Sequence, residues 1–379
     1  MKKRDFIKYG GLLTGAMISG TISSCGNTPE KGTVKRSVKG SSIKLKYKPY
    51  TLQLRHVFAL AAGSRTTTPV VLTQLECDGF TGYGEASMPP YLGESHESVQ
   101  KFLSGVNMEQ FNDPFLMEDI LEYIDGVAPG NYAAKASLDI ALHDLVGKIT
   151  GQPWYRMWGL NPEKAPYTSF TIGDDTSDVV REKVAEAEPY KVLKVKLGLG
   201  NDKNIIETIR SVSDKPIGVD VNQGWEDKHY ALEMAHWLKE QNVIYLEQPM
   251  PKTMTDETGW LTENSPLPVI ADEAFQTIDD LFRVKDFYDG INIKLMKCGG
   301  MNAGYKQAVM ARAMGMKIML GCMTETSCAI SAAAQFSPLV DWADLDGNLL
   351  ISNDIYDGVT VEDGRITLKD RPGIGIVEL

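Results

Sequence analysis

Short apolar runs that each end in a charged residue recur through the middle of the chain. They read VLKVKLG, PIGVDVNQ, VIYLEQP, PVIADE and GINIKLMK, with charged ends roughly 22 to 27 residues apart. Each run has the length of a buried parallel strand, and the spacing leaves room for one crossover helix per strand. PYTSFTIG before them and KIMLGCM and VDWADLDGNLL after them complete eight strands between residues 161 and 350. Repeated right-handed βαβ units of this kind predict a (β/α) barrel.

A different pattern precedes the barrel. Apolar and polar residues alternate in KLKYKPYTLQLRHVF, VVLTQLEC and FTGYGEA, which predicts an antiparallel sheet. From Asn131 to Lys148, apolar residues recur at helical spacing. We therefore expect a separate α+β domain at residues 42–160. The tail, residues 351–379, contains a predicted hairpin through Asp363-Gly364 and should return to this domain.

The expected barrel brings three acidic residues together. Residues at the C-terminal ends of barrel strands point into one mouth, so Asp220, Glu247 and Asp272 should lie close to one another. Carboxylates with few histidines or thiols nearby are hard oxygen ligands, which suit Mg²⁺ better than Zn²⁺ or Cu²⁺. A divalent ion at this point can hold a substrate carboxylate and stabilise negative charge that develops on it.

Two lysines are expected on opposite sides of the same mouth. Lys196 and Lys294 lie on strands four apart in an eight-stranded ring, so they should face each other. A nearby cation disfavours the protonated form of a lysine and lowers its pKa toward working pH. One lysine can take a proton from one face of a planar enediolate while the other returns a proton to the opposite face, as in a racemase or epimerase. Each charged residue alone could instead be a helix cap or a surface charge, but five consecutive strand ends favour a shared site.

The order K-x-K, D-x-N, E-Q-P, D-E and N-I-K-x-x-K-x-G-G resembles the enolase superfamily, muconate-lactonising-enzyme subgroup. The resemblance covers residues 44–379. It implies an α/β fold, a modified (β/α)₇β TIM barrel with an N-terminal α+β capping domain, and Mg²⁺ as cofactor. The roles it implies are metal ligand for Asp220, Glu247 and Asp272, acid/base pair for Lys196 and Lys294, and a place beside the substrate carboxylate for Lys194. Lys297 lies past the catalytic position and is expected to be structural.

Asp344 and Asp346 on the eighth strand narrow the range of reactions that we expect. Side chains two apart on a strand share a face, so both carboxylates can meet one cationic group. The pair resembles the clamp with which dipeptide epimerases bind the free α-ammonium of the N-terminal residue. Cycloisomerases and o-succinylbenzoate synthases have no ammonium to bind. A structural pair at the strand end is the alternative, but the other strand ends favour the clamp.

The resemblance thus implies Mg²⁺-dependent epimerisation of a small-molecule partner, a dipeptide of the L-Ala-D/L-Glu type, by proton transfer between two lysines. Within the fold, the alternatives are a cycloisomerase, an o-succinylbenzoate synthase or an N-acylamino-acid racemase, and the Asp344–Asp346 pair counts against each. A peptide-binding lipoprotein without catalytic activity is the alternative from another class, and the opposed lysines count against it.

Two further residues are expected to line the cavity because they lie at strand ends. Thr171 ends the first strand and could donate a hydrogen bond to the substrate, and Cys322 lies at the end of the seventh strand. Both are therefore substrate-binding candidates.

Loops of the capping domain should set the specificity. In the resembling family two such loops close over the substrate, and here they would be residues 61–68 and 87–93. Arg55 or Arg65 could pair with a side-chain carboxylate, since a guanidinium group suits bidentate binding. The resemblance favours Arg55, although each arginine could instead be a solvated surface residue.

Composition and charge add limits on partners. The chain has 379 residues, of which 43% are hydrophobic and 23% charged, as in ordinary soluble proteins of two domains. Its net charge of −11 argues against nucleic acid or an anionic membrane surface as a partner. Assembly into a homo-oligomer stays open. The cysteines after residue 25 form no C-x-x-C pair, so buried free thiols are expected.

The first 25 residues resemble an export signal. KRDFIK (residues 3–8) resembles a twin-arginine motif with lysine in the first arginine position, and an apolar, glycine-rich run follows it. ISSCG (residues 22–26) resembles a lipoprotein cleavage box with Cys25 as the lipidated residue, and a plain signal peptide is the alternative. Residues 26–41 are polar, as in a linker. We therefore expect an exported protein, periplasmic or at the cell surface, that touches the membrane only through a lipid anchor at Cys25.

Overall fold

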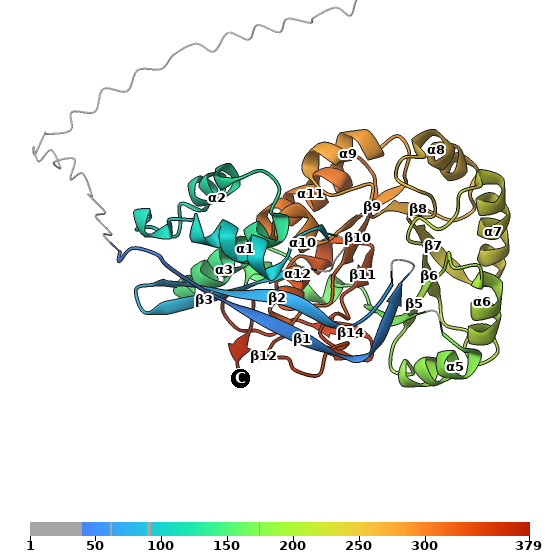
Figure 1. Ribbon diagram of the computed structural model, residues 1–379, viewed down its shortest axis with the longest axis horizontal. Helices are drawn as coiled ribbons and strands as arrows, with labels where there is room; N and C mark the ends of the chain where they lie inside the picture. The colour runs from blue at the N-terminus through green and yellow to red at the C-terminus, as the bar shows by residue number, and fades with distance from the viewer. Residues whose placement is uncertain (1–39, 61–62, 89–91, 174) are drawn as a thin grey trace, which may run out of the picture. The chain divides into compact units, whose positions relative to one another are not determined.

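Two sheets organise the part of the chain that the structure describes. The computed structural model describes residues 40–60, 63–88, 92–173 and 175–379. The expected signal segment, Cys25 and nearly all of the expected linker lie outside the described residues, as do residues 61–62 and 89–91 of the two expected specificity loops. An antiparallel sheet comes first along the chain, and a parallel sheet with helices around it follows (Figure 1). Among the described residues, no helix has the length and apolar character needed to cross a bilayer.

The N-terminal sheet contains β1 (Lys44–Leu60), β2 (Gly63–Cys77) and β3 (Phe80–Ser87), which pair in that order as antiparallel neighbours. Asp78 and Gly79, both with positive φ, form the turn between β2 and β3, as the sequence predicts. The helices that follow are α1 (His96–Ser104), α2 (Met117–Val127), α3 (Tyr132–Thr150) and α4 (Trp154–Met157), with short 3₁₀ turns at η2 (Met108–Gln110) and η3 (Pro162–Lys164).

Helix α3 packs closely against β3. Every residue from Ala133 to Gly147 is buried. Close packing requires glycine on the strand, because a Cβ atom added at Gly84 would lie only 1.9 Å from the carbonyl oxygen of Ser137. Gly82 makes a similar approach to α3 one pleat earlier. The helix predicted from Asn131 to Lys148 therefore packs directly against the antiparallel sheet.

The parallel sheet closes into a barrel. Its strands are β4 (Ser169–Ile172), β5 (Val192–Lys196), β6 (Ile217–Asp220), β7 (Val243–Glu247), β8 (Val269–Ala271), β9 (Gly290–Ile293), β10 (Lys317–Gly321) and β11 (Trp342–Asp344), in that order. A parallel bridge between Thr168 and Ala343 joins the two edge strands, and Leu345 N donates to Thr168 Oγ1 at 2.8 Å. The predicted α/β barrel is thereby confirmed.

Helices connect consecutive barrel strands. They are α5 (Ser177–Glu186), α6 (Asp202–Arg210), α7 (Lys228–Glu240), α8 (Thr255–Asn264), α9 (Ile278–Val284), α11 (Met301–Ala313) and α12 (Ser327–Ala334), with a short α10 (Leu295–Cys298) before α11 and a 3₁₀ turn η4 (Ser337–Leu339) after α12. In the described residues after β11, short strands occur but no helix: β12 (Tyr356–Asp357), β13 (Thr360–Glu362), β14 (Arg365–Thr367) and β15 (Val377–Glu378). This is the (β/α)₇β arrangement.

One apolar core spans the capping sheet and half of the barrel. Buried side chains form a continuous cluster from β1–β3 and α3 to the barrel elements from β8 onward. The tail adds a second connection, because Leu54 of β1 bridges to Ile351 and Ser352 N donates to Gln53 O at 2.9 Å. The hairpin predicted through Asp363-Gly364 forms between β13 and β14.

Candidate active site

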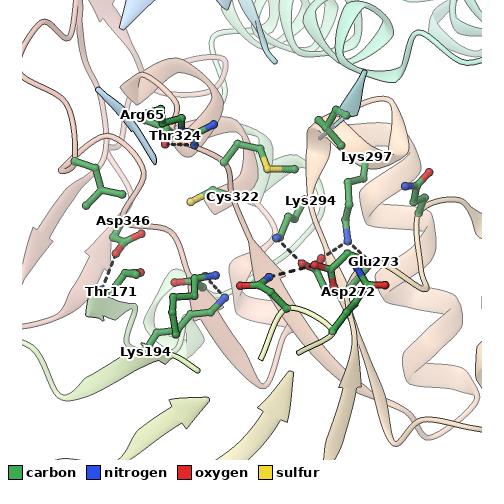
Figure 2. Close-up of a pocket in the computed structure, with 18 of the residues that line it drawn as sticks. Arg65, Thr171, Lys194, Asp272, Glu273, Lys294, Lys297, Cys322, Thr324 and Asp346 are labelled. Atoms are coloured by element: carbon green, nitrogen blue, oxygen red, sulfur yellow. Dashed lines mark hydrogen bonds and ion pairs between the residues drawn. The ribbon is translucent and has the colours of Figure 1, made fainter. Parts of the chain in front are cut away.

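Charged side chains meet where the barrel strands end. The parallel register places Lys196 beside Asp220 and Asp220 beside Glu247. A cavity of about 290 Å³ opens at this end of the barrel (Figure 2). Most residues that the sequence predicts for the site line it: Thr171, Lys194, Lys196, Asp272, Lys294, Cys322, Asp344 and Asp346.

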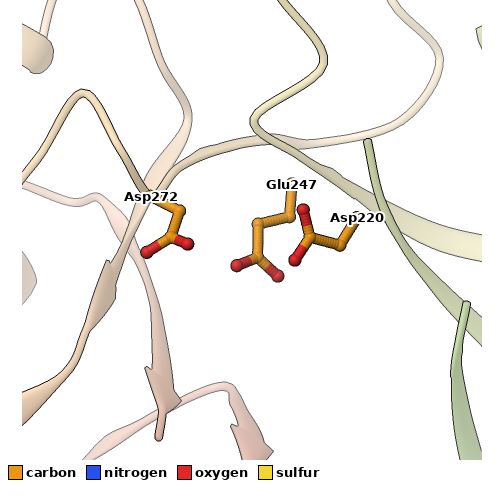
Figure 3. A group of neighbouring side chains, drawn as sticks. All are labelled: Asp220, Glu247 and Asp272. Carbon is orange, nitrogen blue, oxygen red and sulfur yellow. The ribbon is translucent and has the colours of Figure 1, made fainter. Parts of the chain in front are cut away.

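Asp220, Glu247 and Asp272 form a buried acidic cluster, which Figure 3 shows. One carboxylate oxygen of each lies within 4.8 Å of the other two. In the described part of the chain, the buried Glu247 Oε2 accepts no hydrogen bond, although Lys194 Nζ lies 2.7 Å away. Burial, and then the charge of Asp220, raises the pKa of Glu247 to about 7. Three buried carboxylates clustered in this way fit a hard divalent cation such as Mg²⁺.

Two lysines hold Asp272. Lys294 Nζ donates to Asp272 Oδ2 at 2.8 Å, and Lys297 Nζ contacts Oδ1. Lys297 also donates to the carbonyl oxygens of Asp272 at 2.8 Å and of Asn292 at 3.1 Å. Burial alone would raise the pKa of Asp272, but Lys294 and Lys297 lower it below its usual range. Lys297, which the sequence predicts to be structural, lines the cavity and orients a carboxylate of the acidic cluster.

The spacing in NIKLMK could have indicated this role. Lys297 lies in α10, three residues after Lys294, and residues three apart on a helical turn lie on the same side. A strand assignment carried past Ile293 hides this relationship, because strand residues three apart point to opposite faces.

Lys196 and Lys294 approach the acidic cluster from different strands. Lys196 Nζ donates to Asp220 Oδ2 at 2.6 Å, whereas Lys294 binds Asp272. The two lysines come from β5 and from the end of β9, four positions apart in the sheet order. A planar group lying over the acidic cluster would therefore have one lysine on each side.

Lys194 connects the acidic cluster to the eighth strand. Its Nζ lies 3.3 Å from Asp220 Oδ2, 2.7 Å from Glu247 Oε2 and 2.6 Å from Asp344 Oδ2. Burial would lower the pKa of Lys194, but these carboxylates together raise it well above its ordinary value. The three carboxylates therefore favour the protonated form of Lys194.

Asp344 and Asp346 reach the same cavity but have different partners. Asp344 is paired with Lys194 and also accepts from Ser169 Oγ at 2.7 Å. Asp346 lies past the end of β11, and its Oδ2 accepts from the backbone N–H of Thr171 at 2.9 Å. Burial, and then the charge of Asp344, raises the pKa of Asp346 to about 7. The two carboxylates therefore do not bind the same cation in this structure. Asp344 pairs with Lys194, whereas Asp346 forms no ion pair with a lysine among the described residues.

Cys322 lines the cavity, as expected. Burial, and then the charge of Glu325, raises the pKa of the Cys322 thiol well above its ordinary value, which keeps it protonated. The cysteines of the described residues are all free thiols: Cys77, Cys298 and Cys328 are buried, and Cys322 is partly exposed. The expectation of unpaired thiols is confirmed for these four residues.

Arg65, not Arg55, reaches the cavity. Arg65 Nη2 donates to Thr324 Oγ1 at 3.1 Å and the side chain lines the cavity wall (Figure 2). Arg55 Nε donates to the carbonyl oxygen of Ile351 at 2.7 Å, and Arg55 is not among the described residues that line the cavity. The preference for Arg55 is therefore not supported. Arg55 lies within a register shift of the β1–β2 pair, between Gln53 and Phe58, and a regular alternation in the sequence does not reveal this irregularity.

Glu273 and Asn222 also line the cavity and were not among the predicted site residues. Asn222 Nδ2 donates to Glu273 Oε1 at 3.2 Å. Burial, and then the charge of Asp272, raises the pKa of Glu273 to about 7. Asn222 lies two residues after Asp220, and Glu273 directly follows Asp272. The motifs D-x-N and D-E could therefore have indicated both residues.

Family models match most of the described chain. Residues 43–159 match the model described as mandelate racemase / muconate lactonizing enzyme, N-terminal domain. Residues 177–377 match the model described as enolase C-terminal domain-like.

Proteins of similar sequence and structure include several epimerases. The L-Ala-D/L-Glu epimerase of Bacteroides thetaiotaomicron is 57% identical over 382 residues, which cover 100% of this chain and 99% of the relative. The substrate-liganded L-Ala-D/L-Glu epimerase from Bacillus subtilis has a TM-score of 0.82 and 28% identity, over 89% of this chain and 99% of that one. The dipeptide epimerase from Methylococcus capsulatus, complexed with Mg and L-Arg-D-Lys, has a TM-score of 0.80 and 28% identity, over 89% of this chain and 99% of that one.

Proposed function

The chain belongs to the mandelate racemase / muconate lactonizing enzyme family of the enolase superfamily, and we propose that it is a Mg²⁺-dependent dipeptide epimerase that inverts the α-carbon of the C-terminal residue. The observation that carries the proposal is one cavity with an acidic cluster between two opposed lysines, Lys196 and Lys294, and a second acidic pair, Asp344 and Asp346, beside it. The epimerase names of the relatives support the same reaction.

The metal ligands in this proposal are Asp220, Glu247 and Asp272. They are buried and mutually close. When bound, Mg²⁺ would supply positive charge beside the carboxylate of the substrate and offset the negative charge that develops there as the α-proton leaves. Lys294 and Lys297 hold Asp272 in place, so its orientation does not depend on the ion.

The proton transfers belong to Lys196 and Lys294. One Nζ accepts the α-proton from one face of the substrate, and the Nζ of the other lysine donates a proton to the opposite face. Because the chain places these lysines four strands apart, each can reach a different face without moving the substrate. Proton transfer by a positioned side chain contributes about 10² to 10⁴-fold.

Asp344 and Asp346 bind the free ammonium group at the other end of the dipeptide. Asp346, which is held by Thr171, presents a carboxylate with no lysine contact among the described ion pairs, and Asp344 adds a second negative charge. A cycloisomerase or an o-succinylbenzoate synthase would leave both acids without a role. Lys194 lies between the two acidic groups, pairs with both, and supplies fixed positive charge to the substrate carboxylate.

The expected substrates are dipeptides of the L-Ala-D/L-Glu type. Arg65 supports an acidic side chain on the C-terminal residue, because its guanidinium group lines the cavity. The name of the 57% identical relative supports the same choice.

The test is incubation of the protein with Mg²⁺ and L-Ala-L-Glu in D₂O, with the glutamate α-proton followed by NMR. Deuterium uptake together with appearance of the L,D-dipeptide is the expected result. A Lys196→Ala, Lys294→Ala double variant is the control and should give neither signal. Absence of exchange with acidic, hydrophobic and cationic dipeptides alike would refute the proposed reaction.

Export and lipid attachment form a separate part of the proposal, supported by the sequence of residues 3–26 alone. The variant Cys25→Ser should move the protein from the membrane fraction to the soluble exported fraction. Retention of Cys25→Ser in the membrane fraction would contradict lipidation at this residue.

A further inference from the structure

Two side chains at the end of β3 hold the segment that follows β10. Glu85 and Ser87 are two residues apart on β3, so they lie on the same face of the strand. Glu85 accepts hydrogen bonds from Thr326, and Ser87 donates to Thr324, which is likewise two residues away. The capping sheet is therefore joined to residues 322–326 by two matched contacts.

The carboxylate of Glu85 caps a barrel helix. The backbone N–H of Thr326 donates to Oε1 at 3.0 Å and to Oε2 at 3.1 Å, and the Thr326 hydroxyl group also contacts Oε2. Thr326 is itself the N-cap of α12, where its Oγ1 accepts from Cys328 N at 3.1 Å. A residue of the capping domain thus stabilises the first turn of α12, where N–H groups have no partner within the helix.

The segment before this cap is a wall of the cavity. Cys322, Met323 and Thr324 all line it. The Thr324 carbonyl oxygen accepts from Ser87 Oγ at 2.7 Å, and Thr324 Oγ1 accepts from Arg65 Nη2 at 3.1 Å. Figure 2 shows Arg65 next to Thr324 at one edge of the cavity. The position of this wall is therefore set by side chains of β2 and β3.

Burial of the Glu85 carboxylate costs free energy, so we expect this residue to have a particular role at its position. Burial raises the pKa of Glu85 to about 7, although the hydrogen bonds from Thr326 lower it. Asp354 and Glu325 add negative charge nearby, and Glu85 takes part in none of the ion pairs found among the described residues. The hydrogen bonds from Thr326 offset part of this cost, so the contact with the start of α12 is the role that the structure gives to Glu85.

We propose that Glu85 is a positioning residue for the reaction: by holding Thr326, it fixes the Cys322–Thr324 wall against the substrate. The proposal rests on the proposed function, because the wall belongs to the same cavity as Lys194, Lys294 and Asp346. Glu85 touches no reacting atom. Its effect passes through the wall to the alignment of the substrate with the lysines.

Asp139 offers a matched control. Its carboxylate, which comes from α3 of the capping domain, accepts from Met301 N and from Asn302 N at the start of α11. Like Glu85, it is buried and caps a barrel helix from outside the barrel. The residues it holds are not among those that line the cavity in the described structure. Loss of a cap alone should therefore affect both variants, whereas a displaced wall should appear only when Glu85 is changed.

The experiment compares full-length Glu85→Gln and Asp139→Asn with the parent protein. Three quantities are measured: the melting temperature, KM and kcat with L-Ala-L-Glu, and the rate of Cys322 alkylation by iodoacetamide, resolved by peptide mass spectrometry. We expect both variants to melt at lower temperature. Only Glu85→Gln should raise KM, by about 10-fold or more, and speed alkylation of Cys322, the partly exposed thiol of the wall.

Equal changes in the two variants would overturn the proposal, and so would an unchanged KM with unchanged Cys322 alkylation in Glu85→Gln. If Glu85→Gln does not fold, Ser87→Ala takes its place, because it removes the contact with Thr324 without leaving a buried charge unpaired. Alkylation needs no turnover, so it tests the wall independently of the reaction. Failure of the parent protein to epimerise any dipeptide would instead refute the proposed function.

Discussion

Lys194 and Asp344, 150 residues apart in the sequence, form an ion pair of 2.6 Å at the mouth of the barrel. Because Lys194 also contacts Glu247, its positive charge lies between the acidic cluster and the acidic pair of the eighth strand. The cavity therefore presents two anionic groups separated by a fixed cation. A dipeptide has a carboxylate at one end, which a metal ion in the acidic cluster would attract, and an ammonium group at the other.

The variant Asp346→Asn tests the ammonium end of this pattern. We expect KM for dipeptides with a free amino group to rise about 10- to 100-fold, since a hydrogen bond to a charged group contributes about 1.5–3 kcal/mol. Affinity for Mg²⁺ should stay unchanged, because Asp346 is not part of the acidic cluster. Steady-state kinetics and calorimetry measure the two effects. An N-acetylated dipeptide is the control, and Asp346→Asn should not weaken its binding further.

The same carboxylate predicts a pH dependence of KM. Burial and Asp344 raise the pKa of Asp346 to about 7, with Lys194 acting in the opposite direction and Tyr190 nearby. Below that pH the side chain is protonated and neutral, so it attracts an ammonium group less strongly. KM should therefore rise as the pH falls from about 8 to about 6. In Asp346→Asn, KM should not show this rise as the pH falls. If KM rises in the variant as it does in the parent protein, the titration belongs to another group.

Removal of the metal should abolish the reaction. We expect a chelator to stop α-proton exchange and added Mg²⁺ to restore it. Glu247→Gln should abolish Mg²⁺ binding measured by calorimetry, because it replaces a buried carboxylate of the acidic cluster. Glu273→Gln is a matched control, since Glu273 is a partly exposed neighbour whose pKa is also raised to about 7 but which lies outside the cluster. Retained Mg²⁺ binding in Glu247→Gln would remove Glu247 from the ligand set.

The site residues at the strand ends could be predicted from the sequence, because the same short motifs indicate both the strands and the charged residues that follow them. A short apolar run followed by Asp220, Glu247 or Asp272 indicates both a buried parallel strand and the residue at its mouth. The barrel then brings these residues together whatever the details of the helices. Asp344 and Asp346 could be placed by the same argument, although β11 ends at Asp344.

Other parts of the site depend on how separate elements dock, which periodicity does not encode. Arg65 reaches the cavity and donates to Thr324, whereas Arg55, in the irregular part of β1, donates to Ile351 O. Glu85 looks like an ordinary residue of an alternating strand, and its role emerges only when β3 meets the N-terminus of α12. Burial, hydrogen bonding and docking geometry decide these contacts, whose partners lie 241 and 296 positions apart in the chain.

Single-lysine variants separate proton removal from inversion. In Lys294→Ala, Lys196 should still exchange the α-proton of one epimer with solvent, but no proton would be returned to the opposite face. The acidic cluster should persist in this variant, because Lys297 still contacts Asp272 and Lys196 still donates to Asp220.

The measurement is NMR in D₂O with L-Ala-L-Glu and L-Ala-D-Glu in parallel. Lys294→Ala should wash out the α-proton of one epimer only, and Lys196→Ala that of the other. Neither variant should interconvert the two dipeptides. Inversion at the parent rate in either variant would exclude a mechanism that needs both lysines.

Arg65 should select dipeptides with an acidic second residue. Its guanidinium group lines the cavity, whereas that of Arg55 is bonded to Ile351 O outside it. We expect Arg65→Met to lower kcat/KM for L-Ala-L-Glu by about 10- to 100-fold, because a charge-assisted hydrogen bond is worth about 1.5–3 kcal/mol. Turnover of L-Ala-L-Leu should fall much less, since its side chain has no carboxylate to pair. Arg55→Met is the matched control: it removes the same charge from the same sheet and should leave the ratio of the two kcat/KM values unchanged. A shift of that ratio in Arg55→Met, with none in Arg65→Met, would return the specificity role to Arg55.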